Sequence, residues 1–373
     1  MRPDPRPVSD LLSRTPPAGL GVDAAPLVRS MSPGRVTNSY KHLFLRALLA
    51  RVRAGDAAPL FRDLFHGMLA EAWWPAFHYR LTLGRQDRVV ARLEALVEDP
   101  GALRLRPEDV PDYLRHVPFD LARERGQGLL RYVPERLLTP WFPEVPPARV
   151  DRDVAEASRA GFAAVRPLYR IEADRVVLHP DWAAALAAHA PIFDGWSDAI
   201  WLGFLEARNP HATSLLAKIR PAFERGTLTE ERRIWGAALA LGDAQARCIY
   251  TGAPVAPDLF AVDHVLPHAF VGHDRFWNLS PVAPALNLAK SDGLPPEVAV
   301  ARLADQHAVL WRNVGRLGTQ GDRLRRWRDD YGMDLGLDPV AAGQGVFRAA
   351  YAEAYEPLLG IARRMGFPEW EMH

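Results

Sequence analysis

Residues 248–296 read CIYTGAPVAPDLFAVDHVLPHAFVGHDRFWNLSPVAPALNLAKSDGLPP, and they carry the strongest chemical signal in the chain. Asparagine and lysine are scarce elsewhere, and almost all the other basic charge is arginine. The side chains in this stretch that are best suited to chemistry are Asp263, His264, Asn278, Asn287 and Lys290. Their clustering in one short segment marks it as a candidate functional site.

The first part of this stretch predicts a β-hairpin. Residues 248–252 and 259–263 are apolar enough for two short strands, with a proline-containing loop between them. Asp263 and His264 are adjacent, so on a regular strand their side chains point to opposite faces. They can serve one site only if the strand ends there in a bend, and Pro267 supplies a stop signal.

A loop and then a short helix are expected after the hairpin. Pro281 or Pro284 can open the helix, because proline is favoured at the first helical position. The helix is predicted to end near Gly293. Asn287 and Lys290 are then three residues apart and share one face. The expected unit is a hairpin, a loop and a helix that packs back on the hairpin.

With this order of residues, the stretch resembles the HNH nuclease family, which has a ββα-metal fold. In motif it is most similar to the HNH domain of the CRISPR RNA-guided nucleases. The shared pattern is V-D-H-x-x-P-x-x-F, a central asparagine, and then N-x-x-K-S-D. The resemblance does not extend to the flanking regions. Thr251 stands where a second cysteine of the family's zinc-binding pairs would be, so structural zinc is not expected.

The resemblance implies a role for each matching residue. His264 matches the general base, which takes a proton from water. Asp263 and Asn287 match the metal ligands, and oxygen donors suit Mg²⁺, for which Mn²⁺ can substitute. Asn278 matches the residue that braces the loop, and Lys290 is expected near the phosphate. The implied product carries a 5′-phosphate and a 3′-hydroxyl.

Each of these residues also has an ordinary structural explanation. An isolated Asp-His pair is common, Asn278 alone could cap a loop, and Lys290 alone could be a surface residue. The joint pattern favours the nuclease interpretation. His268 and His273 are more typical of loop or substrate-contact histidines than of metal ligands.

A second candidate for nucleic-acid contact lies near the C-terminal end of the chain. Residues 316–328 are locally basic, and Arg325 and Arg326 are the side chains that we expect to contact a phosphate backbone. The alternative is a solvated helix face whose charge neighbouring aspartates partly balance.

The remainder of the sequence has mainly helical periodicity. We therefore expect a mainly α protein with a small inserted ββα-metal unit. The expected regions are a proline-rich arm (1–36), a helical domain (37–245) with a sub-boundary near 139–150, the HNH unit (246–296) and a C-terminal helical segment (297–373).

Composition narrows the class of protein. Hydrophobic residues make up 48% and charged residues 24%, and the formal net charge is +1, so a nucleic-acid surface must be a local patch. Cys248 is the only cysteine, which excludes a disulfide framework within the chain. We see no signal peptide and no apolar run long enough to span a membrane, and expect a cytoplasmic protein with no membrane partner.

The function expected from the sequence is metal-dependent hydrolysis of phosphodiester bonds in DNA. An HNH unit beside a large helical region resembles effectors of bacterial anti-phage or restriction systems. RNA cleavage by the same site is an alternative. Another is a non-catalytic nucleic-acid-binding or assembly subunit with an idle site. Target choice is assigned to the helical regions or to a protein partner.

Overall fold

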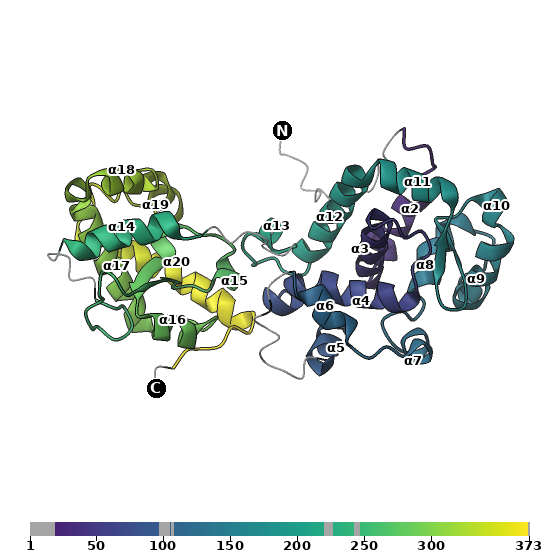
Figure 1. Cartoon of the computed structure of the whole chain (residues 1–373), viewed down its shortest axis with the longest axis horizontal. Helices are drawn as coiled ribbons and strands as arrows, with labels where there is room; N and C mark the ends of the chain where they lie inside the picture. Colours follow the sequence, from purple (N-terminus) through teal and green to yellow (C-terminus); the bar gives the residue numbers. More distant parts are fainter. Residues whose placement is uncertain (1–18, 97–104, 106–107, 220–226, 242–246, 372–373) are drawn as a thin grey trace. The chain divides into compact units, whose positions relative to one another are not determined.

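The structure is a computed structural model that describes residues 19–96, 105, 108–219, 227–241 and 247–371. It divides into two compact units, the first comprising residues 1–210 with 215–222 and the second 211–214 with 223–373. The described residues are mainly helical, as the sequence predicts, and they contain two small antiparallel sheets (Figure 1). None of the described helices is long and apolar enough to cross a bilayer.

The first unit is built from helices with one two-stranded sheet. Its elements are α2 (Ala25–Ser30), η1 (Pro33–Arg35), α3 (Tyr40–Arg53), α4 (Phe61–Ala72), the π-helix η2 (Trp73–His78), α5 (Val89–Leu96), α6 (Val110–Arg115), α7 (Leu121–Gly126), α8 (Val133–Leu138), η4 (Thr139–Trp141), η5 (Pro147–Arg149), α9 (Val150–Ala160), α10 (Phe162–Val165), β1 (Tyr169–Ile171), β2 (Val176–Leu178), α11 (Pro180–Ala188), α12 (Ala190–Glu206) and α13 (Leu215–Lys218).

Helices α3 and α4 form the centre of this unit, because apolar side chains recur on each at helical spacing. Leu43, Phe44 and Leu64 have no exposed surface. Trp73 and Trp74 are also buried, which confirms that this aromatic pair belongs to the core.

The expected proline-rich arm is partly a packed segment. Residues 1–18 lie outside the described residues, but from Leu20 onward the chain is folded into the first unit. Helix α2 places Leu27 and Val28 in the core, and Met31 follows them. The expectation of an extended arm is therefore wrong for residues 19–36, because this stretch has enough apolar side chains to pay the entropy of ordering it.

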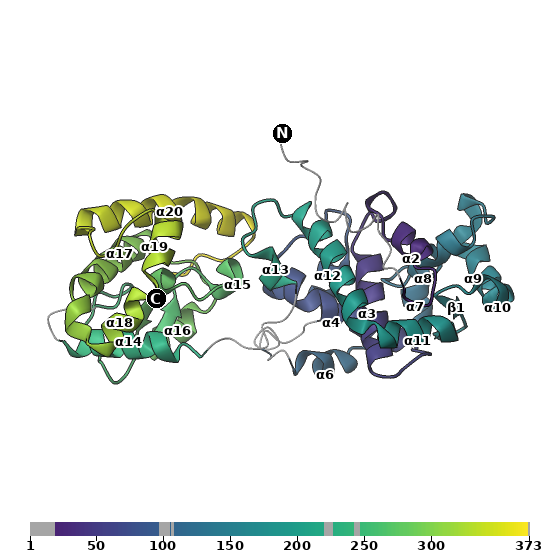
Figure 2. The same ribbon diagram turned by 90° about the horizontal axis from the view of Figure 1, so that it is seen from above.

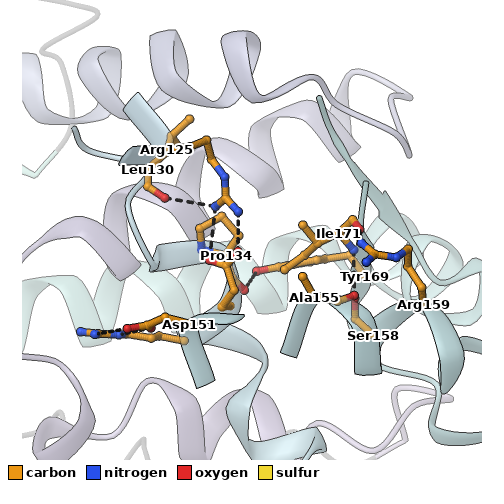
Figure 3. Close-up of polar contacts among 11 residues, drawn as sticks. Arg125, Leu130, Pro134, Asp151, Ala155, Ser158, Arg159, Tyr169 and Ile171 are labelled. Atoms are coloured by element: carbon orange, nitrogen blue, oxygen red, sulfur yellow. Dashed lines mark hydrogen bonds and ion pairs between the residues drawn. The ribbon is translucent and has the colours of Figure 1, made fainter. Parts of the chain in front are cut away.

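The segment before α8 is held in place by polar contacts (Figure 3). The Arg125 guanidinium donates to the carbonyl of Leu130 at 3.3 Å and pairs with the buried carboxylate of Glu135. The Tyr169 hydroxyl donates to the carbonyl of Pro134 at 2.8 Å. These contacts fix the loop that leads into α8.

The second unit surrounds a short hairpin with helices (Figures 1 and 2). Its elements are α14 (Thr229–Ala240), β3 (Ala261–His264), α15 (His268–Val271), η6 (Phe276–Asn278), β4 (Leu279–Val282), α16 (Pro284–Lys290), α17 (Glu297–Arg312), η7 (Val314–Leu317), α18 (Thr319–Arg325), α19 (Arg328–Leu335) and α20 (Gln344–Arg364).

The hairpin differs from the predicted one in its first strand. Strand β3 pairs antiparallel with β4, and Asp263 lies opposite Ser280. Residues 248–252 form a turn instead of a strand, in which the Gly252 N–H donates to the Cys248 carbonyl at 2.8 Å. Gly252 has a φ of 72°, a left-handed conformation that glycine adopts readily and that reverses the chain.

The C-terminal helices hold the hairpin in place. The His307 ring on α17 donates from Nε2 to the Leu279 carbonyl at 3.0 Å, and Gln306 accepts a hydrogen bond from the Ser280 hydroxyl at 2.8 Å. Helix α14 also contacts both strands. The compact unit therefore begins before the expected boundary at 245 and continues past 296, because the four-residue strands need helices on their faces to be buried.

Candidate active site

Asp263 is a buried carboxylate with a partner on each oxygen. It lies on β3 and is 3% exposed. The Tyr250 hydroxyl donates to Oδ2 at 2.5 Å, and the Lys290 ammonium lies 3.2 Å from Oδ1. Burial and the neighbouring carboxylate of Asp263 raise the pKa of Tyr250 well above its usual value, so this phenol remains a donor. The charge of Asp263 is thus stabilised before any metal ion is considered.

Lys290 is buried against Asp263, and its place beside a phosphate stays a prediction. Its side chain is fully buried, and its ammonium donates to the carbonyl oxygen of His264 at 2.8 Å as well as to Asp263. Helix α16 begins at Pro284, one of the two prolines predicted to open it, and ends at Lys290 rather than near Gly293. Ser291 follows with a φ of 48°, which ends the helix. Lys290 therefore fastens α16 to the end of β3.

His264 is oriented by a carboxylate. Its Nε2 lies 2.7 Å from Oδ1 of Asp274, which makes Nε2 the protonated nitrogen and leaves Nδ1 with a free lone pair. The same aspartate oxygen lies 3.8 Å from Nε2 of His268, and the two imidazole rings are 5.2 Å apart at their centroids. His268 thus joins the His264–Asp274 cluster, with 12% of its side chain exposed.

Asn278 fixes the bend that follows the Asp-His pair. Strand β3 ends at His264, and the next two residues bend as the sequence predicts. The Asn278 side chain accepts from the Leu266 N–H at 2.8 Å and donates to the Leu266 carbonyl at 2.9 Å. Tyr355 on α20 adds a third hydrogen bond to Asn278 Oδ1 at 2.8 Å. Asn278 has no exposed surface, so the structure places it as a brace.

Asn287 is positioned on the same helix as Lys290. It lies one turn earlier on α16, so the two share a face, and α16 packs against β3. Its side chain is half-buried, and its amide makes no hydrogen bond within the described ranges of the chain. The side-chain oxygen of Asn287 is therefore available to a ligand.

Sequence reasoning missed several residues of this cluster. Asp274 follows His264 by ten positions, and no motif marks it. Tyr250 lies in a segment predicted only as a strand, and Tyr355 lies in one predicted only as helical. Glu231 on α14 is a further acid near this cluster. Burial raises its pKa above the usual value, and the charge of Asp274 adds to this effect. These partners come from segments that only the fold brings together.

The expected basic contact surface is largely neutralised. Arg325 pairs with Asp322 at 2.6 Å, and Arg326 pairs with Glu230 at 2.8 Å. Both arginines are exposed at the end of α18 or just beyond it. The two pairs weaken the case for this surface as a nucleic-acid contact, which stays a prediction.

The donor set fits a small hard cation. Asp263 would offer a carboxylate oxygen and Asn287 an amide oxygen, and such a set would leave the remaining positions to water and substrate, as Mg²⁺ prefers. A carboxylate has about four acceptor positions, and Tyr250 and Lys290 use two of those on Asp263. No group of three or more His, Cys, Asp or Glu side chains suited to a metal ion occurs among the described residues.

Comparison with known proteins agrees with this geometry. Residues 248–296 match the model of a family described as HNH endonuclease. No curated protein and no solved structure gives a significant match to the chain. The matched segment contains the turn at Cys248, the hairpin, the braced bend and helix α16. Over residues 248–296 the chain is thus similar to the HNH endonucleases, and this similarity points to nuclease chemistry on nucleic acid.

Proposed function

We propose that the chain is a metal-dependent endonuclease that hydrolyses phosphodiester bonds in DNA. The observation that carries the proposal is the pair formed by His264 and Asp274, at 2.7 Å, next to the buried Asp263 on the same strand as His264. An imidazole whose Nε2–H is held by a carboxylate keeps Nδ1 free to accept a proton. That is the arrangement that a general base requires.

The chain's own residues supply the proton transfer and the geometry. A water molecule gives a proton to Nδ1 of His264 as its oxygen attacks phosphorus. The bond from phosphorus to the 3′ oxygen breaks, and the leaving oxygen takes a proton from solvent. Asp274 holds the ring and stabilises the imidazolium that forms.

Asp263 and Asn287 would hold the metal ion, which we infer to be Mg²⁺ with Mn²⁺ as a substitute. When bound, the ion would supply positive charge that offsets the negative charge developing on the phosphate group. Lys290 is assigned a positioning role, since its ammonium reaches Asp263 and the backbone of His264 at once. Asn278 is likewise a positioning residue.

Target choice is assigned to regions outside the HNH segment. The hairpin and α16 contain the cutting residues but few side chains that could read a sequence. We propose that the first unit or a protein partner selects the target, in a bacterial defence or restriction role.

The test is a cleavage assay on purified full-length protein. Supercoiled plasmid, linear DNA and RNA would each be incubated with Mg²⁺, Mn²⁺ or a chelator. We expect DNA cleavage with either metal and none with chelator, leaving 5′-phosphate ends. Cleavage of RNA alone would overturn the DNA assignment, and cleavage in chelator would overturn the metal dependence.

A further inference from the structure

The first unit contains a large cavity that is far more basic than the chain as a whole. Its volume is about 830 Å³, and it lies between η1, the start of α3, α5, α7 and α8. Seven of the side chains that line it are lysine or arginine, and Glu124 is its single acidic one. The whole chain has 46 basic and 45 acidic residues. The excess of positive charge in this cavity is therefore local.

Two of the seven cations are neutralised within the fold. Arg92 pairs with Glu124 at 2.8 Å, and that carboxylate also accepts from the Leu129 N–H at 2.9 Å. Arg136 makes a two-point contact with Asp151, which Figure 3 labels, at 2.8 and 2.7 Å. The one acidic lining residue is thus already used.

The other five cations have no carboxylate partner within the described residues. The four arginines among them are exposed. The fifth cation, Lys41, donates to the carbonyls of Ser30 and Arg35, both at 3.1 Å. Converging unpaired cations repel one another, and an anion between them relieves that repulsion. The five are Arg35, Lys41, Arg88, Arg123 and Arg131.

The pKa of Lys41 is lowered by its surroundings in the cavity. Burial in the first place, and then the charges of Arg35 and Arg136, lower its pKa to about 8. Burial is the main cause of this shift, and the two guanidinium charges add to it.

An aromatic platform lies in the same cavity. The Tyr132 ring has the guanidinium of Arg131 at 4.3 Å from its centroid and that of Arg136 at 4.5 Å. Its backbone φ is 66°, which is uncommon for a bulky residue and shows that the surrounding contacts impose this position. Planar guanidinium groups and aromatic rings are surfaces on which nucleobases stack.

The backbone on both sides of Tyr132 is fixed by hydrogen bonds. Tyr169 and Arg125 hold the backbone at Pro134 and Leu130 (Figure 3). A cavity of this size falls in the range of small-molecule sites, which are largely formed before the ligand arrives.

We propose that this cavity binds a nucleotide with two or more phosphates. The phosphates lie among Arg35, Lys41, Arg88, Arg123 and Arg131, and the base stacks on the Arg136 guanidinium that lies over Tyr132. This ligand site is separate from the HNH segment and goes beyond the proposed nuclease function. It holds whether or not the HNH site cuts.

The proposal is tested by calorimetric titration of the full-length protein with ATP and GTP. Adenosine, inorganic tripolyphosphate and a single-stranded DNA oligonucleotide serve as comparison ligands. We expect at least one nucleotide to bind, adenosine to give no measurable binding, and tripolyphosphate to bind more weakly than the nucleotide.

Variants locate the binding. We expect the double change Arg88→Ala and Arg131→Ala to raise the Kd of the nucleotide about tenfold or more, because each charged hydrogen bond to phosphate is strong. Arg152→Ala is the matched control, since Arg152 is exposed in the same unit and pairs with its neighbour Asp153. Unchanged melting temperatures would show that both variants fold.

Several results would overturn the proposal. They are no binding of ATP or GTP, equal nucleotide affinity in the double variant, and tripolyphosphate binding as tight as that of the nucleotide. Loss of oligonucleotide binding alone in the double variant would assign the cavity to a nucleic-acid strand instead.

Discussion

The ammonium of Lys290 lies 3.2 Å from Oδ1 of Asp263, and both side chains are buried. The pair joins the last residue of α16 to the strand that carries His264. A buried ion pair is costly to break, because the remaining charge has lost both water and its partner. A metal ion at Asp263 would therefore have to share that carboxylate with the Lys290 ammonium.

Lys290→Met should destabilise the second unit. The expected loss is about 3 kcal/mol or more, since Asp263 would retain Tyr250 as its only donor. Mg²⁺ should restore part of the loss, because the cation takes over the stabilisation of the carboxylate. Denaturant unfolding with and without Mg²⁺ measures both effects.

The double variant Asp263→Asn with Lys290→Met provides the control. It should be more stable than Lys290→Met alone, because no buried charge is left unpaired. A single variant as stable as the wild type would show that the ion pair does not form.

Asp274→Ala should slow cleavage far more than it affects folding. Without the carboxylate the His264 ring is free to change tautomer and orientation, and we expect a loss of about 10²-fold to 10³-fold in rate. Asp322→Ala is the matched control, because Asp322 is an exposed partner of Arg325 in the same unit. Equal rates for the two variants would remove Asp274 from the mechanism.

Asn278→Ala should lower both stability and activity. The change leaves the N–H and carbonyl of Leu266 without their partners in a buried bend, which costs about 2–4 kcal/mol. Tyr355→Phe removes one hydrogen bond to the same oxygen and should cost about 1 kcal/mol. Thermal unfolding and cleavage rates check the order, and a larger effect of Tyr355→Phe would contradict the assigned brace.

Acid should destabilise the second unit through His307. Burial lowers the pKa of His307 from 6.5 to about 3. Below pH 6.5 the unfolded chain binds a proton that the folded chain excludes, so stability falls with pH by about 1.4 kcal/mol per unit until about pH 3. His307→Gln should make the unfolding free energy of this unit less pH-dependent between pH 7 and 5. An unchanged slope would show that His307 titrates normally in the folded state.

The sequence predicts the motif residues of the candidate site better than it predicts the residues that hold them in place. The spacing of Asp263, His264 and Asn287 comes from a local motif, and Pro284 opens α16 as expected. The hairpin partner was predicted wrongly because residues 248–252 have strand-like composition, whereas the hydrogen bonds at Gly252 make them a turn. Amino-acid composition alone does not predict a turn that depends on backbone hydrogen bonds.

The partners of the site could not be predicted because they are brought in by folding. Tyr355 reaches Asn278 across 77 positions of sequence, and Asp274 reaches His264 across a loop. Neither contact leaves a periodic signal. The basic cavity likewise collects cations from five separate segments, and a net charge of +1 conceals it.

We have assigned His264 as the general base of a metal-dependent nuclease site. The most direct test is the rate of plasmid cleavage in Mg²⁺ for the wild type, His264→Ala and the exposed-histidine control His116→Ala. We expect normal cleavage by His116→Ala and a loss of about 10²-fold or more for His264→Ala, with folding intact. Cleavage by His264→Ala at the wild-type rate would contradict it.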